Sequence, residues 1–175
     1  MDTDSLIRQY RQPPPLLIVL SGPSGVGKDV ALARLRAARP SCHFVVTATT
    51  RPRRPGERDG VDYIFMSPQQ FQETLAHDGF LEHAQVYGHQ YGVPRQQVRE
   101  ALARGQDVVV KIDVQGAATI KRLAPQGVFI FLAPPSLEEL ARRLHARKTE
   151  SAADLEVRLA TARAEMQRIS MFDYV

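Results

Sequence analysis

The sequence predicts an α/β fold in which a parallel sheet is flanked by helices. Short apolar runs alternate along the chain with helical patterns, which is typical of parallel crossover units. A glycine-rich loop lies directly between the first apolar run and the first helical pattern. The segment 48–105 interrupts the alternation with turn-rich and tyrosine-containing stretches, so we expect it to form a lobe inserted into the core.

Four apolar runs are expected to form the strands of the sheet, because they are short, continuous and bounded by turn residues. They are 16–21, 43–47, 107–113 and 127–133. Helices are expected over 29–39, which ends before Pro40, over 67–79, over 114–124, and over 136–172 with a break near 147–151. Within the lobe, alternation along 80–94 predicts short antiparallel strands.

The chain has the size and composition of one globular domain, with 175 residues of which 43% are hydrophobic and 24% charged. Residues 1–15, which end in three prolines, are expected to be a flexible extension before a domain at 16–175. No apolar run approaches the roughly 20 residues that cross a bilayer. Cys42 is the only cysteine, which fits a reducing compartment, so we expect a cytoplasmic protein without membrane attachment.

The formal net charge is +4, and most of the positive charge is arginine, whose planar donors suit phosphate oxygens. The sequence has no nucleic-acid-binding signature, and its basic residues are not interleaved with aromatic ones. A phosphorylated small molecule is therefore the expected partner, rather than a nucleic acid.

The stretch "GPSGVGK" at 22–28 fits the phosphate-binding (P-loop) pattern G-x-x-x-x-G-K between an expected strand and an expected helix. Its glycines allow backbone N–H groups to converge on phosphate oxygens, and Lys28 supplies a point charge for the β and γ phosphates. A glycine-rich turn with a solvated lysine is the alternative, which the flanking elements disfavour. The predicted triphosphate site comprises Gly22, Pro23, Ser24, Gly25, Val26, Gly27, Lys28 and Asp29.

Asp29 stands where such loops carry a serine or threonine hydroxyl that binds Mg²⁺. A carboxylate is a hard oxygen donor and can ligate Mg²⁺ directly or through water. Its negative charge opposes polyphosphate binding unless the metal lies between them. We therefore expect a weaker or differently hydrated magnesium site, and not the loss of triphosphate binding. The five histidines have no metal-ligand spacing.

Five further motifs follow the loop in order: "TATTRPRRPGE" (47–57), "GVDYIF" (60–65), "FLEHAQVYGHQYG" (80–92), "IDVQGA" (112–117) and "FLAPPSLEEL" (131–140). With these motifs the chain resembles guanylate kinases from Leu16 to its last residue. The resemblance implies a nucleoside-monophosphate kinase fold, with a monophosphate-binding lobe at 48–105 and a helical lid at 142–158. It also implies that the partners are ATP and GMP, that the products are ADP and GDP, and that Mg²⁺ is the cofactor. We expect a monomer.

The resemblance assigns the GMP site to Thr47, Arg51, Arg54, Tyr63, Glu82 and Tyr91. Two guanidinium groups and two phenol hydroxyls suit a dianionic phosphate. Glu82 matches the family's guanine reader, and a carboxylate can accept both the N1–H and the N2 amino group of guanine. Such a site rejects adenine because its buried acceptors would be left unpaired.

The resemblance also implies which residues act in phosphoryl transfer. Asp113 matches the acidic residue near the metal and the transferred phosphate, so the expected metal ligands are Asp29 and Asp113. Arg143, Arg147 and Arg158 match lid arginines, whereas we expect Arg142 to be solvated. Phosphoryl transfer depends mostly on positioning and charge neutralisation. The expected catalytic set is Lys28, Arg51, Asp113, Arg143, Arg147 and Arg158.

The chain departs from the family pattern at three further places. Val93 stands where a Ser or Thr commonly contacts the base, which predicts a higher KM for GMP. Lys111 stands where the family often has an acid, and we expect it to pair with Asp113 or with a phosphate, or to be a charge just outside the sheet. The family's last strand and final helix are expected to be absent, which exposes a sheet edge and lowers stability.

Two other functions are compatible with parts of this pattern. A ribose-bisphosphate kinase of the same fold would share the phosphate loop and the arginines, but Glu82, Thr47 and the two tyrosines favour a guanine nucleotide. A guanylate-kinase-like domain that only binds peptides would usually lack the intact loop and the lid arginines.

Overall fold

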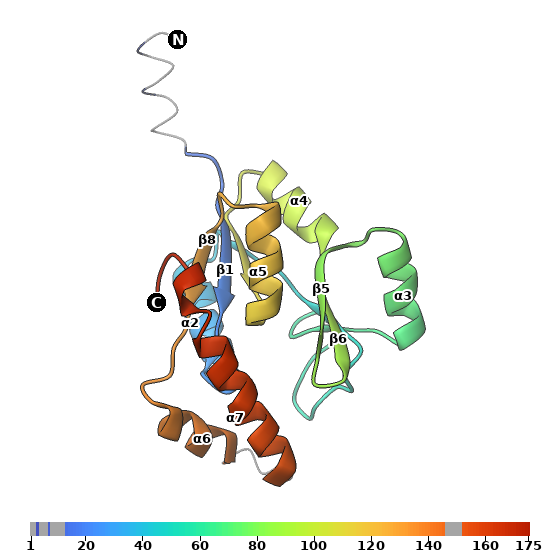
Figure 1. The fold of residues 1–175 in the computed structure, drawn as a ribbon. Coiled ribbons are helices and arrows are strands. Elements are labelled where there is room, and N and C mark those ends of the chain that lie inside the picture. The colour runs from blue at the N-terminus through green and yellow to red at the C-terminus, as the bar shows by residue number, and fades with distance from the viewer. Residues whose placement is uncertain (1–2, 4–6, 8–12, 146–151) are drawn as a thin grey trace.

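A four-stranded parallel sheet forms the centre of the computed structural model, which describes residues 3, 7, 13–145 and 152–175 (Figure 1). Its strands are β1 (Leu17–Ser21), β2 (His43–Phe44), β7 (Val108–Lys111) and β8 (Val128–Phe131). They lie in the order β2-β7-β1-β8, and every neighbouring pair is parallel. The expected α/β fold with a helix-flanked parallel sheet is confirmed.

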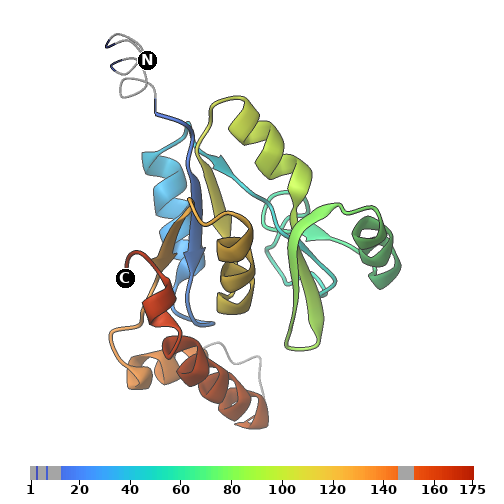
Figure 2. The same ribbon diagram turned by 45° about the horizontal axis from the view of Figure 1, so that its top comes forward.

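Two helices cover opposite faces of this sheet. Helix α2 (Lys28–Ala38) joins β1 to β2, and α5 (Val114–Leu123) joins β7 to β8. These crossovers run in opposite directions along the strand order, so right-handed connections place the helices on opposite faces (Figure 2). The loops that follow β1 and β7 therefore meet at one edge of the sheet, where open α/β sheets bind ligands.

The lobe has a sheet and a small core of its own. Its elements are β3 (Ala48–Thr49), β4 (Ile64–Phe65), α3 (Pro68–Ala76), β5 (Phe80–Val86) and β6 (His89–Pro94). The hairpin β5–β6 is antiparallel, as expected, and β6 pairs antiparallel with β3, but β3 and β4 are parallel. Phe71 stacks on Phe80 with ring centroids 4.4 Å apart, which joins α3 to the sheet.

Helix α4 (Arg95–Ala103) was not among the predicted helices. Pro94 occupies its N-cap position, and the fully buried Ala101 and the buried Val98 pack into the main core with residues of β7 and α5. The sequence signal was the spacing of apolar residues after a proline. Because α4 lies inside the segment 48–105 and packs on the core sheet, the chain leaves the lobe before this helix begins.

The predicted strand 43–47 is too long, because β2 contains only His43 and Phe44. The chain leaves the sheet at Val46, whose backbone N–H and C=O are both bonded by the side-chain amide of Gln97 at 3.0 and 3.2 Å. The Gln97 side chain, which projects from α4, thus takes the place of the backbone hydrogen-bond partners that Val46 would have in a longer strand.

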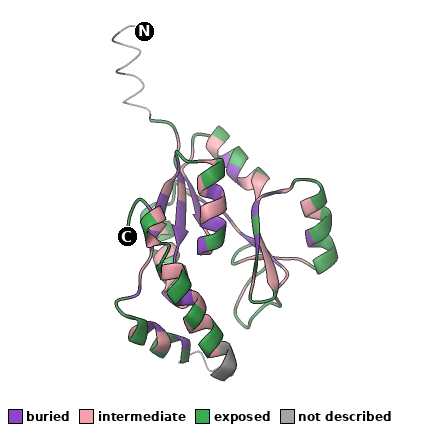
Figure 3. Ribbon diagram, in the orientation of Figure 1, coloured by how far each residue is buried: buried purple, intermediate pink, exposed green. Residues whose placement is uncertain are grey.

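Two helices of the C-terminal segment lie below the sheet edge in Figure 1, and a 3₁₀ turn follows them. The helices are α6 (Leu137–His145) and α7 (Ala152–Met166), and the 3₁₀ turn is Ile169–Met171. Val26 of the phosphate loop packs in one apolar cluster with Leu140, Leu144 and Ala162 of these helices. Figure 3 shows that the buried residues concentrate in the core strands, whereas the outer faces of the helices are exposed.

The last residues continue the parallel sheet. Tyr174 bridges Ile130 in the parallel sense, and the Phe131 N–H donates to the Tyr174 carbonyl at 2.8 Å. Asp173 accepts the N–H of Phe129 and pairs with Lys121 of α5 at 2.9 Å. Within the described ranges, no helix combines the length and the apolar character that a membrane span requires.

Replacing Phe131 with alanine is expected to lower the free energy of unfolding by about 3–5 kcal/mol. Phe131 is 1% exposed and packs edge-on against Phe172 with centroids 5.0 Å apart, so the substitution leaves a cavity between β8 and the C-terminal segment. Leu123→Ala is the control, since Leu123 is 59% exposed and should change stability by less than about 1 kcal/mol. Urea denaturation measures both, and equal midpoints would contradict the assigned core.

Candidate active site

One cavity of about 550 Å³ connects the phosphate loop, the lobe and helix α7. It brings together most of the residues predicted from the sequence: Gly22, Ser24, Gly25, Gly27, Lys28, Asp29, Thr47, Arg51, Arg54, Tyr63, Glu82, Tyr91, Asp113 and Arg158. Pro23, Val26 and Arg143 are described but do not line it. Arg147 lies outside the described residues.

The phosphate loop turns sharply between β1 and α2. Gly22 has φ 137°, and a Cβ there would lie 2.3 Å from the carbonyl oxygen of Leu132, so only glycine fits beside this strand end. Gly27 caps α2 with φ 107°. The Lys28 ammonium donates to the carbonyls of Gly22 and Pro23, which fixes it across the loop. Burial lowers the pKa of Lys28 to about 8, against the opposing charge of Glu165.

Glu165 is a cavity residue that the sequence analysis missed. It projects from α7, and its Oε2 atom is buried without a hydrogen-bond partner among the described residues. Burial raises the pKa of Glu165 to about 7, although the charge of Lys28 acts in the opposite direction. A single glutamate on an amphipathic helix carries no motif, so only the packing of α7 against the cavity identifies it.

Two lid arginines contact the phosphate loop itself. Arg143 donates to the carbonyl of Val26 at 3.0 Å and to Glu139 at 2.6 Å. Arg158 donates to the Ser24 hydroxyl at 3.3 Å, and its guanidinium lies 4.7 Å from the ring centroid of Tyr87 at the tip of the β5–β6 hairpin. Arg158 therefore spans from the loop to the lobe. Arg142 has a side chain that is 79% exposed, as expected, and it pairs with Glu139.

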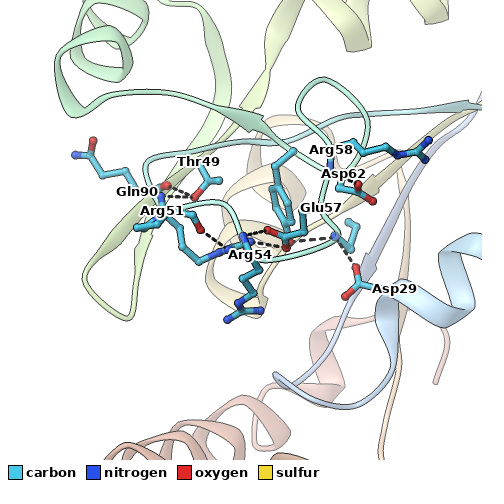
Figure 4. Close-up of polar contacts among 11 residues, drawn as sticks. Asp29, Thr49, Arg51, Arg54, Glu57, Arg58, Asp62 and Gln90 are labelled. Atoms are coloured by element: carbon cyan, nitrogen blue, oxygen red, sulfur yellow. Dashed lines mark hydrogen bonds and ion pairs between the residues drawn. The ribbon is translucent and has the colours of Figure 1, made fainter. Parts of the chain in front are cut away.

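In the lobe, Arg51 is held by a carboxylate that the sequence analysis did not single out. Arg51 is 9% exposed and donates to Glu57 at 2.8 Å, while the other oxygen of Glu57 accepts the backbone N–H of Arg54 (Figure 4). Burial alone would lower the pKa of Arg51, but Glu57 and Tyr91 hold it above its ordinary value. The guanidinium lies 5.3 Å from the ring centroid of Tyr63, which fixes both groups at the cavity wall.

Glu82 is the most deeply buried carboxylate of the site, at 5% exposed. Its Oε1 atom has no hydrogen-bond partner among the described residues. Burial, with a smaller contribution from the charge of Asp113, raises the pKa of Glu82 to about 8. A Cβ on Gly116 would lie 2.8 Å from Oε1, so the glycine of α5 leaves the space that the carboxylate occupies. Val93, opposite Glu82 in the β5–β6 pairing, is fully buried and offers no hydroxyl.

Asp113 ends the loop after β7 and caps α5. Its Oδ1 atom accepts the backbone N–H groups of Gln115 and Gly116 at 2.8 and 3.0 Å. These bonds orient the carboxylate at the carboxyl edge of the sheet, opposite the phosphate loop. The position agrees with the sequence prediction, whereas the proposed pairing of Asp113 with Lys111 does not.

Lys111 forms its contacts with Asp29 and Tyr63 instead. Its ammonium donates to Asp29 Oδ1 at 2.6 Å and to the Tyr63 hydroxyl at 3.1 Å. Burial alone would lower the pKa of Lys111, but Tyr63 and Asp29 together hold it above its ordinary value. Of the alternatives expected for Lys111, pairing with Asp113 is not formed: Asp113 Oδ1 caps α5, and the Lys111 ammonium reaches Asp29 on α2 across the sheet edge.

The carboxylates of the site suit a metal ion that arrives with a nucleotide. The described part of the chain contains no group of three or more His, Cys, Asp or Glu side chains able to hold an ion by themselves. Asp29 and Asp113 nevertheless both line the cavity. Mg²⁺ in nucleotide sites typically takes one or two carboxylates, with phosphate oxygens and water completing its shell, so the two residues fit such an ion.

Comparison with known proteins gives one consistent family. The guanylate kinase family model matches residues 15–175. A guanylate kinase of Desulfitobacterium hafniense is 47% identical over 160 residues, covering 91% of this chain and 80% of that protein. Guanylate kinase 2 of rice, named as chloroplastic/mitochondrial, is 49% identical over 164 residues, which cover 93% of this chain. The aligned region spans only 58% of the rice protein.

A solved structure agrees with these relatives. The crystal structure of guanylate kinase from Anaplasma phagocytophilum superposes with a TM-score of 0.74 at 33% sequence identity, covering 92% of this chain and 75% of that one. The similarity therefore extends over the core sheet, the lobe and the described part of the lid.

Glu82→Gln is expected to stabilise the protein increasingly as the pH rises from 5 to 8. The folded protein retains the Glu82 proton up to a pKa of about 8, whereas the unfolded chain releases it near the ordinary value of 4.5. The folded state binds more protons in this window, so the free energy of unfolding of the wild type falls with pH through this group. Glutamine at position 82 does not titrate, so the variant does not lose stability with pH through this group.

Thermal unfolding of wild type and Glu82→Gln at each pH from 5 to 8 measures this effect as a widening difference in Tm. Glu73→Gln, on the exposed part of α3, is the control that should show a constant difference. Parallel curves for Glu82→Gln and wild type would mean that the buried carboxyl is already charged in the folded protein.

Proposed function

The chain belongs to the guanylate kinase family, and from this premise we propose that it transfers the γ-phosphoryl group of ATP to GMP, yielding ADP and GDP. The observation that carries the proposal is the single cavity that joins an intact phosphate loop to a lobe with a buried carboxylate and held arginines. The two alternatives, a ribose-bisphosphate kinase and a peptide-binding domain, have no observation in their favour.

ATP is proposed to bind with its phosphates on the loop between β1 and α2. Support comes from the backbone turn at Gly22 and Gly27, which aims the start of α2 at the cavity, and from the position of the Lys28 ammonium. The Lys28 contacts with loop carbonyls are exchangeable for phosphate oxygens. Phosphate binding is expected to raise the pKa of Lys28, because it adds negative charge to a buried cation.

GMP is proposed to bind in the lobe, with its phosphate on Arg51, Arg54, Tyr63 and Tyr91 and its base at Thr47 and Glu82. Glu57 supports this role because it holds Arg51 and the Arg54 backbone in one arrangement before any substrate contact. Glu82 must be charged to accept both guanine donors. Because these donors stabilise the carboxylate, GMP binding below pH 8 is coupled to release of the Glu82 proton.

In the transfer, an oxygen of the GMP phosphate attacks the γ-phosphorus of ATP. The bond to the β,γ-bridging oxygen breaks, and its electron pair leaves with ADP. The charge on the transferring group is proposed to be neutralised by Lys28, Arg51, Arg143 and Arg158, with Arg147 assigned by resemblance alone. Arg143 and Arg158 support this role because both already contact the phosphate loop.

Mg²⁺ bound with ATP would supply positive charge that offsets the negative charge of the triphosphate. Asp29 and Asp113 are the residues proposed to hold it, through direct or water-mediated contacts. The expectations of a monomer and of a cytoplasmic location stay predictions, as does the higher KM for GMP expected from Val93.

The proposal is tested by coupled ADP release from Mg·ATP with GMP, AMP and ribose 1,5-bisphosphate measured side by side. Turnover with GMP alone is the expected result, because only guanine offers Glu82 its two donors. Turnover with ribose 1,5-bisphosphate, or with no acceptor among the three, would contradict the proposed function.

Lys28→Ala is expected to reduce kcat by about 10³-fold or more while the Tm changes little, because the removed charge acts on the phosphates. Arg142→Ala is the control, since that arginine is exposed and pairs with Glu139 on the same helix. The same ADP-release assay measures both variants. Near-normal turnover of Lys28→Ala would remove the loop from the mechanism.

Gly116→Ala is expected to raise the KM for GMP about tenfold or more, with the KM for ATP nearly unchanged. The added methyl group would displace the Glu82 carboxylate, whose Cδ and Oε1 atoms lie 2.8 Å from its position. Thr119→Ala on the same helix is the control. An equal rise in both KM values would indicate general disturbance of α5 rather than an effect on base recognition.

A further inference from the structure

Asp29 and Lys111 form an ion pair that crosses the active-site edge of the sheet. Both residues replace the types expected at their positions, a hydroxyl at 29 and an acid at 111. We propose that Lys111 is a further catalytic residue, which contacts phosphate groups between the donor and acceptor sites, and that Asp29, in addition to its proposed contact with Mg²⁺, positions it. The inference rests on the proposed phosphoryl transfer and specifies how this chain neutralises charge during that reaction.

Lys111 is placed on the donor side by the register of the core sheet. It is the last residue of β7 and pairs with Leu20 of β1, next to Ser21, which precedes the phosphate loop. Its ammonium reaches Asp29 in the first turn of α2, the residue after Lys28. The positive charge of Lys111 contributes to the lowered pKa of Lys28, which agrees with the closeness of the two ammonium groups.

The same ammonium lies on the acceptor side. It donates to the Tyr63 hydroxyl at 3.1 Å and lies 4.6 Å from the centroid of the Tyr63 ring. The Arg51 guanidinium lies 5.3 Å from that centroid, and both residues line the cavity. Tyr63 and Arg51 are proposed ligands of the GMP phosphate. Lys111 therefore lies between the two sites that must exchange a phosphoryl group.

The two residues of the ion pair differ in how far their side chains are buried. The Lys111 side chain is 13% exposed, whereas that of Asp29 is 75% exposed. A buried ammonium needs a hydrogen-bonding anion, and desolvation strengthens its attraction to any phosphate that enters the cavity. Asp29 thus orients the Lys111 ammonium, and the phosphates are its expected ligands during turnover.

The carboxylate at position 29 and the cation at position 111 are therefore expected to depend on each other. Asparagine at 29 removes the charge that orients Lys111, and methionine at 111 leaves Asp29 as an anion beside the polyphosphate. If Asp29 served only as a metal ligand, its substitution would act on Mg²⁺ independently of residue 111. A positioning role therefore predicts that the effects of substitutions at 29 and 111 are coupled, whereas a metal role predicts that they are independent.

The test is a double-mutant cycle with Asp29→Asn, Lys111→Met and the double variant. Each protein is assayed for kcat and for both KM values across a magnesium titration. Calorimetry measures GMP binding without ATP, and Tm measures folding. Lys111→Arg tests rescue by a conservative change. Lys121→Met and Asp173→Asn are the matched control cycle, because this Lys–Asp pair lies between α5 and the C-terminal segment and does not line the cavity.

Lys111→Met is expected to lower kcat about 10²-fold and to weaken GMP binding measurably, as removal of one preorganised charge does. Asp29→Asn is expected to lower kcat about tenfold, and to add no further loss in the Lys111→Met background. Lys111→Arg should recover part of kcat. The Lys121–Asp173 cycle should change Tm while leaving kcat unchanged.

Three outcomes would overturn the inference. The first is a kcat of Lys111→Met within twofold of wild type. The second is additivity of the two substitutions, which would return Asp29 to an independent metal role. The third is a loss in kcat that follows a loss in Tm, which would mean that the substitutions act through the stability of the fold. Absence of GMP phosphorylation by the wild type is a separate result, which would refute the proposed function itself.

Discussion

The parallel pairing of β1 with β7 is the constraint on which the site depends. Because both strands run the same way and lie side by side, the loops at their carboxyl ends face each other across one edge. That edge holds the phosphate loop after β1, Lys111 at the end of β7, and Asp113 in the loop that follows β7. The lobe and the lid add groups to this edge but do not create it.

The cavity is lined by charged groups of both signs. Lys28 has a pKa lowered by burial, and Glu82 and Glu165 have pKa values raised by it, so each of these groups is less stable in its charged form than in water. A protein pays for such groups in stability, which is typical of sites organised to bind charged ligands. A bound nucleotide would stabilise these charged forms, because its phosphates pair with the cations and its base donates hydrogen bonds to Glu82.

The sequence was sufficient for the sheet class and for most cavity residues, because both depend on local signals. The glycine loop, the arginine turn and the aspartate after "VVVKI" are short motifs attached to strand ends. The partners that depend on packing were not predictable in the same way. Glu57 ends the motif at 47–57, but nothing in the motif identifies it as the partner of Arg51. Glu165 beside Lys28 and Gln97 beside Val46 each meet across segments far apart in the sequence. The parallel β3–β4 pair was missed for the same reason, whereas helix α4 was missed although the apolar spacing after Pro94 is a local signal.

Apolar packing of Val26 joins the phosphate loop to the lid. Its side chain is 5% exposed within the cluster formed with Leu140 and Leu144, so the lid cannot swing away without exposing apolar surface. Exposing one such side chain costs about 1.5–3 kcal/mol, which slows opening by roughly one to two orders of magnitude if the cost falls on the barrier. Opening of the lid to release ADP therefore carries the cost of exposing this apolar contact.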